Sequence, residues 1–228
     1  MVIRHKNLRT LGFDRSIRRI AEQEVAKVIP RVQGKLEREL KTEMRLVYRD
    51  SFTAQELNGG NLQGELGIVD PAGKGAAIEE ALADSVQIEV RQVRGGIRRF
   101  FPLLRIKTLT DDFTELLRLP EASQAWTDAK FSTVKGPPLP WLRWLLRDGT
   151  KTIIRGASLI RGKAGRSGLD YQMTSNNGRG TWKVPPEHAG TPRNNFLTRN
   201  LNARLPELRR RFTAIVNNAI RGLRSRGR

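Results

Sequence analysis

The stretch IRRIAEQEVAKVIPRVQGKLERELKTEMRLV, from Ile17 to Val47, carries the clearest helical pattern in the chain. Its apolar residues recur mostly at intervals of three or four, with arginine, lysine and glutamate between them. The recurring residues are Ile17, Ile20, Val25, Val28, Val32, Leu36, Leu40, Met44 and Val47. The pattern predicts a long amphipathic helix over 14–50 whose apolar stripe faces the core or a second subunit. Pro30 and Gly34 interrupt the stripe, so we expect a kink there or two nearly aligned helices.

A second helical pattern lies near the end of the chain. Its apolar residues are Leu208, Phe212, Ile215, Val216, Ala219, Ile220 and Leu223. The prediction is a closing helix over 202–223, with Pro206 in its first turn because proline is tolerated there. A basic arm over 1–13 precedes the first helix, and a basic tail over 224–228 follows the last one.

The region between the helices predicts strands and loops over 58–201. Residues 58–75 are rich in glycine and predict turns, and 76–85 predicts a short helix. Residues 86–93 alternate apolar with polar side chains, and Gly95-Gly96 predicts a tight turn into a second strand, giving a β-hairpin over 86–107. We therefore expect one α+β domain over 1–228: a long N-terminal amphipathic helix, a central antiparallel sheet, and a C-terminal helix packed on the sheet.

The composition points to an anionic partner. The 228 residues include 42 Lys and Arg against 23 Asp and Glu, a formal net charge of +19. Such an excess attracts DNA, RNA, an anionic membrane or an acidic protein. The chain has no cysteine, which excludes disulfides, thiolate metal sites and a cysteine nucleophile. No apolar run has the length of a membrane span, and we expect no secretory signal and no membrane partner.

The residues that carry chemistry are sparse, and we expect no enzyme activity, no metal and no cofactor. His5 and His188 are the only histidines, and neither has a positioned partner in the sequence. The phosphate-loop pattern GxxxxGK[ST] is absent. Asp70 and Glu89 resemble the acids of metal-dependent nucleases, but Arg91 stands where those sites usually carry a lysine. Glu89 is more simply explained as a polar position of an alternating strand.

The arginines of the closing helix and tail are the candidate contacts to DNA or to an acidic partner. They are Arg209, Arg210, Arg211, Arg221, Arg224, Arg226 and Arg228. A run of charge is often only a solvated helix face, but here it coincides with the large net charge. Sequence-specific recognition is not expected, because no helix-turn-helix or zinc-finger pattern occurs.

The segment WKVPPEHAGTPRNNFLTRNL, from Trp182 to Leu201, predicts a structural clasp. Its prolines hold an extended apolar strip that docks with little loss of entropy. Asn194 or Asn195 is placed to cap a helical turn that begins at Phe196. The predicted clasp and subunit-interface residues are Trp141, Trp144, Trp182, Val184, Pro185, Pro186 and Phe196. We expect them to pin the apolar segment 141–146 to the terminal helix, within one subunit or against the next.

This region also carries a resemblance. PWLRWLLRDGTKTII (140–154) and WKVPPEHAGTPRNNFLTRNL (182–201), with the Gly149-Thr150 pair, the 62–66 segment and the final helix, are similar to the tail-completion or head–tail joining proteins of tailed bacteriophages. Specific sequence motifs match only over 137–201. In the rest of the chain the match is limited to the order of helices and strands. That group usually ends with a Pro-Phe-Leu-x-Pro element, where this chain has Asn194-Asn195-Phe196-Leu197.

The resemblance implies a non-catalytic virion protein of the phage neck or tail. Such proteins form homo-oligomeric rings, commonly sixfold or twelvefold, between the portal or adaptor and the tail tube. The genomic DNA passes through the lumen without sequence-specific contact, and assembly takes place in the host cytoplasm. Two alternatives remain: a non-specific nucleic-acid-binding packaging or nucleoid protein, and a nuclease that uses Asp70 and Glu89.

Overall fold

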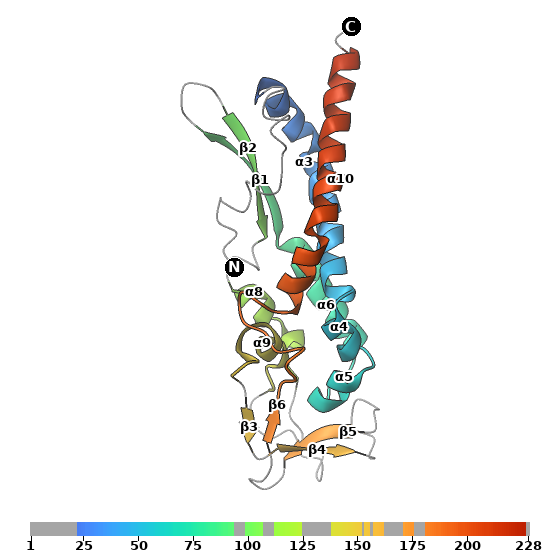
Figure 1. The fold of residues 1–228 in the computed structure, drawn as a ribbon, viewed down its shortest axis with the longest axis vertical. Coiled ribbons are helices and arrows are strands. Elements are labelled where there is room, and N and C mark those ends of the chain that lie inside the picture. The colour runs from blue at the N-terminus through green and yellow to red at the C-terminus, as the bar shows by residue number, and fades with distance from the viewer. Residues whose placement is uncertain are drawn as a thin grey trace.

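The fold is an elongated, mostly helical body built on two long helices (Figure 1). The computed structural model describes residues 22–93, 99–106, 112–124, 138–151, 153–155, 157–161, 171–175 and 181–226. Helix α3 (Glu22–Arg49) and helix α10 (Phe196–Arg226) run side by side in opposite directions. The first half of α3 packs against the second half of α10, where Val28, Val32 and Leu36 meet Val216 and Ile220. The apolar spacing of both segments therefore predicted the faces that meet.

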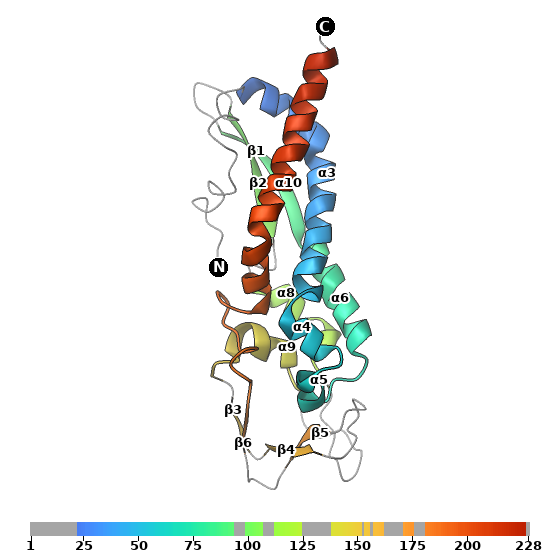
Figure 2. The same cartoon turned by 45° about the vertical axis from the view of Figure 1, so that its right-hand side comes forward.

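Helix α3 is one continuous helix with Pro30 inside it. Proline has no N–H to donate and its ring clashes with the preceding turn, which bends a helix. Figure 2 shows the first part of α3 turned away from the rest of the helix. Residues 14–21 of the predicted helix lie outside the described residues.

Helix α10 begins six residues before the predicted closing helix and contains Pro206 in its interior. The prediction of a start at 202 was wrong because it gave Pro206 the position in the first turn that proline prefers. Asn195 caps the helix at Phe196 instead, and the helix tolerates the one backbone hydrogen bond that Pro206 cannot make.

Three helices follow α3, in a region where the sequence predicted turns over 58–75 and a short helix over 76–85; the predicted short helix is confirmed as part of α6. Helix α4 (Phe52–Leu57) is capped by Ser51, and α5 (Asn61–Leu66) ends at Gly67 in the left-handed conformation, with φ of 62°. Helix α6 (Pro71–Asp84) is capped by Asp70, whose side chain accepts from the N–H of Gly73 at 3.0 Å. It runs back along α3. Gly67 ends α5, whereas Gly64, Gly73 and Gly75 lie inside α5 and α6, so the density of glycine was wrongly taken as the sign of a loop.

The predicted central antiparallel sheet is wrong. The described strands form three separate two-stranded ribbons, and most of the described residues are helical. Strand β1 (Val86–Val93) pairs antiparallel with β2 (Arg99–Ile106), with Val86 opposite Ile106, so the two strands predicted over 86–107 do pair. The predicted Gly95-Gly96 turn between them lies outside the described residues.

The other two ribbons lie at the opposite end of the body from the C-terminus (Figure 1). Strand β3 (Ile153–Arg155) pairs with β6 (Thr181–Lys183), and β4 (Ala157–Arg161) pairs with β5 (Tyr171–Ser175). The C-terminal helix packs on α3 and does not cover a sheet, which corrects the predicted packing. Two-stranded ribbons bury little by themselves, so the helices supply the core.

Short helical segments fill the space below the long helices. They are α8 (Thr114–Leu117), the 3₁₀ turn η1 (Pro120–Ala122), α9 (Trp141–Arg143) and the π-helical turn η2 (Trp144–Asp148). They contribute Leu116, Trp141, Leu142 and Leu145 to the main core, together with Phe113, which precedes α8. In the described part of the chain, no helix is both long enough and apolar enough to cross a membrane.

Candidate functional site

The clasp segment lies directly on the helical turn formed by α9 and η2. Gly190 and Gly149 allow this contact: a Cβ on Gly190 would overlap the main-chain oxygen of Leu145 and lie 2.7 Å from Cβ of Asn195. A Cβ on Gly149 would overlap the oxygen of Trp144 and lie 3.0 Å from Cα of Ala189. Backbone meets backbone here, so only glycine fits at both positions.

Asn195 is the polar centre of the contact. Its side chain is fully buried, and its amide donates to the main-chain oxygens of Leu146 at 3.2 Å and Thr191 at 2.9 Å. Its side-chain oxygen accepts from the N–H of Thr198 at 3.0 Å, while the hydroxyl of Thr198 accepts from the N–H of Asn195 at 2.9 Å. These reciprocal bonds form a capping box at the start of α10. Asn195 therefore links the clasp, η2 and α10 in one network.

Most of the predicted clasp residues are buried inside this one chain. Trp141 is 1% exposed and donates from Nε1 to the oxygen of Glu121 at 3.0 Å. Trp182 is 7% exposed and donates from Nε1 to Glu65 at 3.1 Å, and its ring lies 6.1 Å from that of Trp144. Because these rings already have intramolecular partners, they are not free for a neighbouring subunit.

The remaining clasp residues divide between the core and the surface. Val184 is 1% exposed, and Phe196 is 4% exposed with its ring edge-on to Tyr48 at 6.1 Å between centroids. Pro185 is half-buried and Pro186 is exposed. Of the seven predicted residues, Pro186 is exposed, Pro185 and Trp144 are half-buried, and the other four are buried.

His188 is a buried residue of the clasp segment and has two partners from α4. Its Nδ1 lies 3.1 Å from the hydroxyl of Thr53, and its ring stacks on Phe52 at 5.2 Å between centroids. Burial lowers the pKa of His188, with smaller opposing effects from Glu187 and Glu56. Phe52 is itself 58% exposed. The burial of the ring and its stacking on Phe52 support a packing role, and among the described residues the ring is hydrogen-bonded to the hydroxyl of Thr53 and to no carboxylate.

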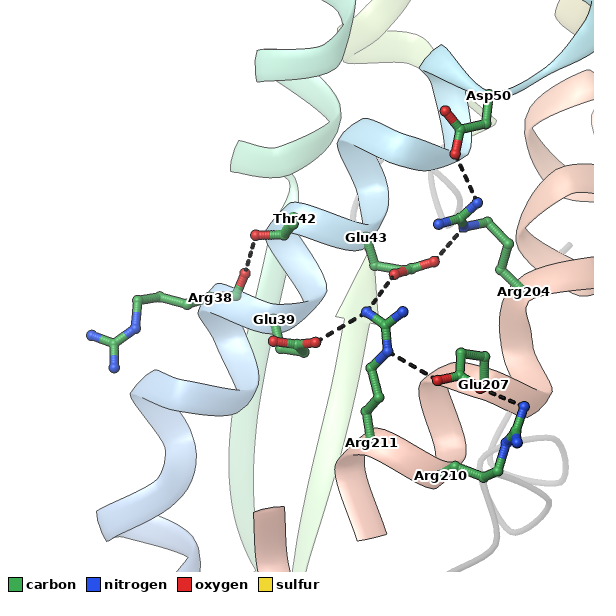
Figure 3. A network of polar contacts seen from close by, with 9 residues as sticks. All are labelled: Arg38, Glu39, Thr42, Glu43, Asp50, Arg204, Glu207, Arg210 and Arg211. Atoms are coloured by element: carbon green, nitrogen blue, oxygen red, sulfur yellow. Dashed lines mark hydrogen bonds and ion pairs between the residues drawn. The ribbon is translucent and has the colours of Figure 1, made fainter. Parts of the chain in front are cut away.

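A network of arginines and carboxylates joins α3 to α10 (Figure 3). Glu43 on α3 is 1% exposed and pairs with Arg204 and Arg211 of α10. Arg204 also bonds Asp50 at 2.9 Å, and Arg211 bonds Glu39 at 3.2 Å. A buried carboxylate requires such partners, since an unpaired charge in the core is costly. The network fixes how the two helices align.

The arginines predicted to contact DNA or an acidic partner differ in pairing and exposure. Arg211 faces α3 and pairs with Glu39, Glu43 and Glu207. The hydrogen bonds that it donates to Glu207 and Glu39 raise its pKa. Arg210 pairs with Glu207. Arg209 is half-buried, and its Nε has no hydrogen-bond partner among the described residues. Arg221 is exposed, while the side chains of Arg224 and Arg226 and all of Arg228 lie outside the described structure.

A basic face of α3 was missed by the sequence reasoning. Arg31, Lys35 and Arg38 are all exposed and follow one another at four and three residues, which places them on one side of the helix. Among the described residues none of the three has an ion pair. The signal was present in the spacing, but it was read only as the solvated side of an amphipathic helix.

No arrangement of catalytic groups occurs in the described residues. Asp70 serves as the cap of α6, which leaves its carboxylate engaged with the N–H of Gly73. The side chains of Glu89 and Arg91 lie outside the described structure. Within the described ranges, no three His, Asp or Glu side chains are grouped as metal ligands.

The comparisons with known proteins yield no matching family model, no similar curated protein and no similar solved structure.

Proposed function

We propose that this chain is a structural subunit of a phage head–tail connector, in the tail-completion or neck position, and that it makes and breaks no covalent bond. It works as a ring-forming building block between the portal and the tail tube. The DNA that passes through the ring meets a basic surface without reading its sequence. The resemblance over 137–201 is the source of the connector assignment.

The observation that carries the proposal is the uneven distribution of charge along the body. Residues 208–228 contain seven arginines and no Asp or Glu, whereas residues 50–90 contain eight acidic residues and one lysine. The acidic segment includes α6, whose carboxylates pair with the adjacent half of α3. Arg210 and Arg211 pair with Glu207, Glu39 and Glu43, but beyond them the described part of the end that holds the C-terminus has no such compensation. A polyanion at that end would offset the self-repulsion.

The contacts of the clasp favour a rigid structural subunit over one that changes conformation. Its polar groups are satisfied within the chain, and its glycines allow backbone contact that tolerates little displacement. A subunit that holds a lumen open around DNA needs such a fixed shape.

The mass of the purified protein is the direct test. Light scattering or native mass spectrometry would be run on the chain alone and after mixing with the portal and tail-tube proteins of the same phage. We expect a closed oligomer of six or twelve copies, alone or with one of these partners. A chain that stays monomeric with every virion partner, or that is missing from a reconstruction of the connector, would sink the proposal.

The second candidate is a non-specific nucleic-acid-binding packaging or nucleoid protein, and the same uncompensated charge favours it. This alternative predicts tight DNA binding by the free monomer with a steep dependence on salt. The connector subunit instead binds DNA weakly in solution and gains avidity only in the ring. Affinity measured before and after assembly separates the two.

A further inference from the structure

One side of α3 is lined with basic residues along most of its length. In the second half of α3 these residues form ion pairs. Lys41 pairs with Asp84 at 3.6 Å, Arg45 with Glu80 at 2.7 Å, and Arg49 with Glu79 at 2.5 Å. All three carboxylates belong to α6. The hydrogen bonds that Arg49 donates to Glu79 raise the pKa of Arg49. The second half of the face is thus neutralised by an acidic neighbour within the chain.

Helix α6 ends at Asp84, which pairs with Lys41, so the basic face of α3 before Lys41 extends past the end of α6. Arg31, Lys35 and Arg38 are exposed there, and no described carboxylate pairs with any of them. The nearest acidic residues on α3 are engaged elsewhere: Glu37 with Lys41, and Glu39 with Arg211. The first half of the face therefore presents three positive charges that nothing in the described structure neutralises.

We infer that Arg31, Lys35 and Arg38, which we call the α3 basic stripe, contact the phosphate backbone of duplex DNA. At a rise of 1.5 Å per residue the stripe spans about 10 Å along the helix. One strand of B-DNA places a phosphate every ~3.4 Å along its axis, so the stripe matches about three phosphates. Non-specific contact of this kind needs charge and reach, and it needs no base recognition.

DNA fits the surroundings better than an acidic protein helix does. The stripe lies at the same end of the body as the last turns of α10, because Val28, Val32 and Leu36 pack against Val216 and Ile220. Arg221, exposed at that end, adds positive charge, and no acidic residue follows Glu207 in the chain. A long polyanion interacts with this whole field, whereas one acidic helix would cover only the stripe. The choice of DNA as the occupant rests on the proposed function.

The test compares two triple variants of the full chain that lose the same charge. The first is Arg31→Gln, Lys35→Gln and Arg38→Gln. The matched control is Arg118→Gln, Lys151→Gln and Arg193→Gln, which removes three exposed basic residues from loops elsewhere. Both variants lower the formal net charge from +19 by three. Binding to a fluorescent 30-base-pair duplex would be followed by anisotropy between ~50 and ~200 mM NaCl, a range over which phosphate contacts weaken strongly.

We expect the stripe variant to bind at least ~10-fold more weakly at ~100 mM salt, and its slope of log affinity against log salt to fall by about 2 to 3, near 0.9 per phosphate contact. The control should stay within about threefold of wild type. Equal weakening of both variants would overturn the stripe and leave only a net-charge effect. Wild-type DNA binding by the stripe variant, with loss of a virion protein partner, would overturn DNA as the occupant and identify an acidic protein.

This test is independent of the oligomer test. If the protein forms a closed ring but its stripe variant binds DNA like the control variant, the proposed contact by the stripe is wrong and the connector function still holds. If the protein stays monomeric but its DNA binding depends on the stripe, the proposed contact is supported and the connector function is wrong. Melting curves of both variants would be compared with wild type, and surface substitutions of this kind should change stability by no more than ~0.5 kcal/mol.

Discussion

The side-chain amide of Asn195 donates a hydrogen bond to the main-chain oxygen of Leu146 at 3.2 Å, across 49 positions of the chain. The same side chain caps α10 through Thr198. One buried residue therefore both starts the last helix and holds it to η2.

Asn195→Ala should lower the free energy of unfolding by about 2 to 3 kcal/mol. It removes a helix cap, worth about 1 kcal/mol, and leaves the buried oxygens of Leu146 and Thr191 with fewer donors. Urea unfolding measures the loss. Asn194→Ala is the control, because Asn194 is exposed and its side chain makes only a long contact with Arg199, at 3.4 Å. Equal stability of the two variants would show that Asn195 does not hold the clasp.

Gly190→Ala should destabilise the fold strongly, by roughly 3 kcal/mol or more, because the new methyl group would overlap the oxygen of Leu145. Gly34→Ala is the matched substitution on α3, where nothing lies within 4 Å of the added carbon. It should stabilise the protein by about 0.5 to 1 kcal/mol, since alanine favours a helix interior. Thermal melting of both variants checks the pair. If both change stability in the same direction, the close backbone approach at Gly190 is refuted.

Glu43→Gln should cost about 2 to 3 kcal/mol of stability. The substitution removes a buried charge that faces two arginines, and breaking a buried pair usually costs about 3 to 5 kcal/mol. The loss is smaller here because Arg204 keeps Asp50 and Arg211 keeps Glu39. Chemical denaturation measures it. Glu37→Gln, which removes only the pair with Lys41 at 3.9 Å, should stay within ~0.5 kcal/mol.

A stable Glu43→Gln variant would mean that the network in Figure 3 does not set the alignment of α3 and α10. A double-mutant cycle with Arg204→Ala isolates the coupling between these two side chains.

Acidification should destabilise the protein through His188. Its pKa is lowered in the folded state by burial, so the unfolded state binds the proton more readily. The stabilising neutral form is fully present above the ordinary value of 6.5, and its contribution falls as the pH decreases through that value toward the folded pKa. The free energy of unfolding would be measured between about pH 8 and 5.5, above the ordinary range of carboxylates.

The variants of the two histidines separate the sources of this pH dependence. His188→Gln should flatten the curve, whereas His5→Gln should leave the fall unchanged. Parallel curves for wild type and His188→Gln would show that another group is responsible.

Trp182→Ala should destabilise the protein by about 3 to 5 kcal/mol, the usual loss for a buried aromatic ring. Trp182→Phe keeps most of the apolar contact with Trp144 and loses only the bond from Nε1 to Glu65, so it should cost about 1 kcal/mol. Calorimetry distinguishes the two. Wild-type melting of the alanine variant would mean that the ring is not part of the core.

The sequence predicted the features that depend on nearby residues. The spacing of Val28, Val32 and Leu36 marked the buried face of α3, because a helix repeats every 3.6 residues whatever it packs against. Asn195 was one of two caps considered for a helix at Phe196, and capping is a contact over three residues. The strands that pair over 86–107 were also predicted, since their alternation is local.

Features that depend on distant residues were decided only by the tertiary structure. Local patterns predicted strands, but they did not show that the ribbons remain separate and that α10 packs on α3. The glycines of 59–67 predicted turns, but the segment 61–66 is a helix that buries Leu62 and Leu66 in the main core. Arg211 and Arg38 look alike as letters. One is paired and the other exposed because a carboxylate 172 positions away meets Arg211, and such a meeting is fixed by packing rather than by local spacing.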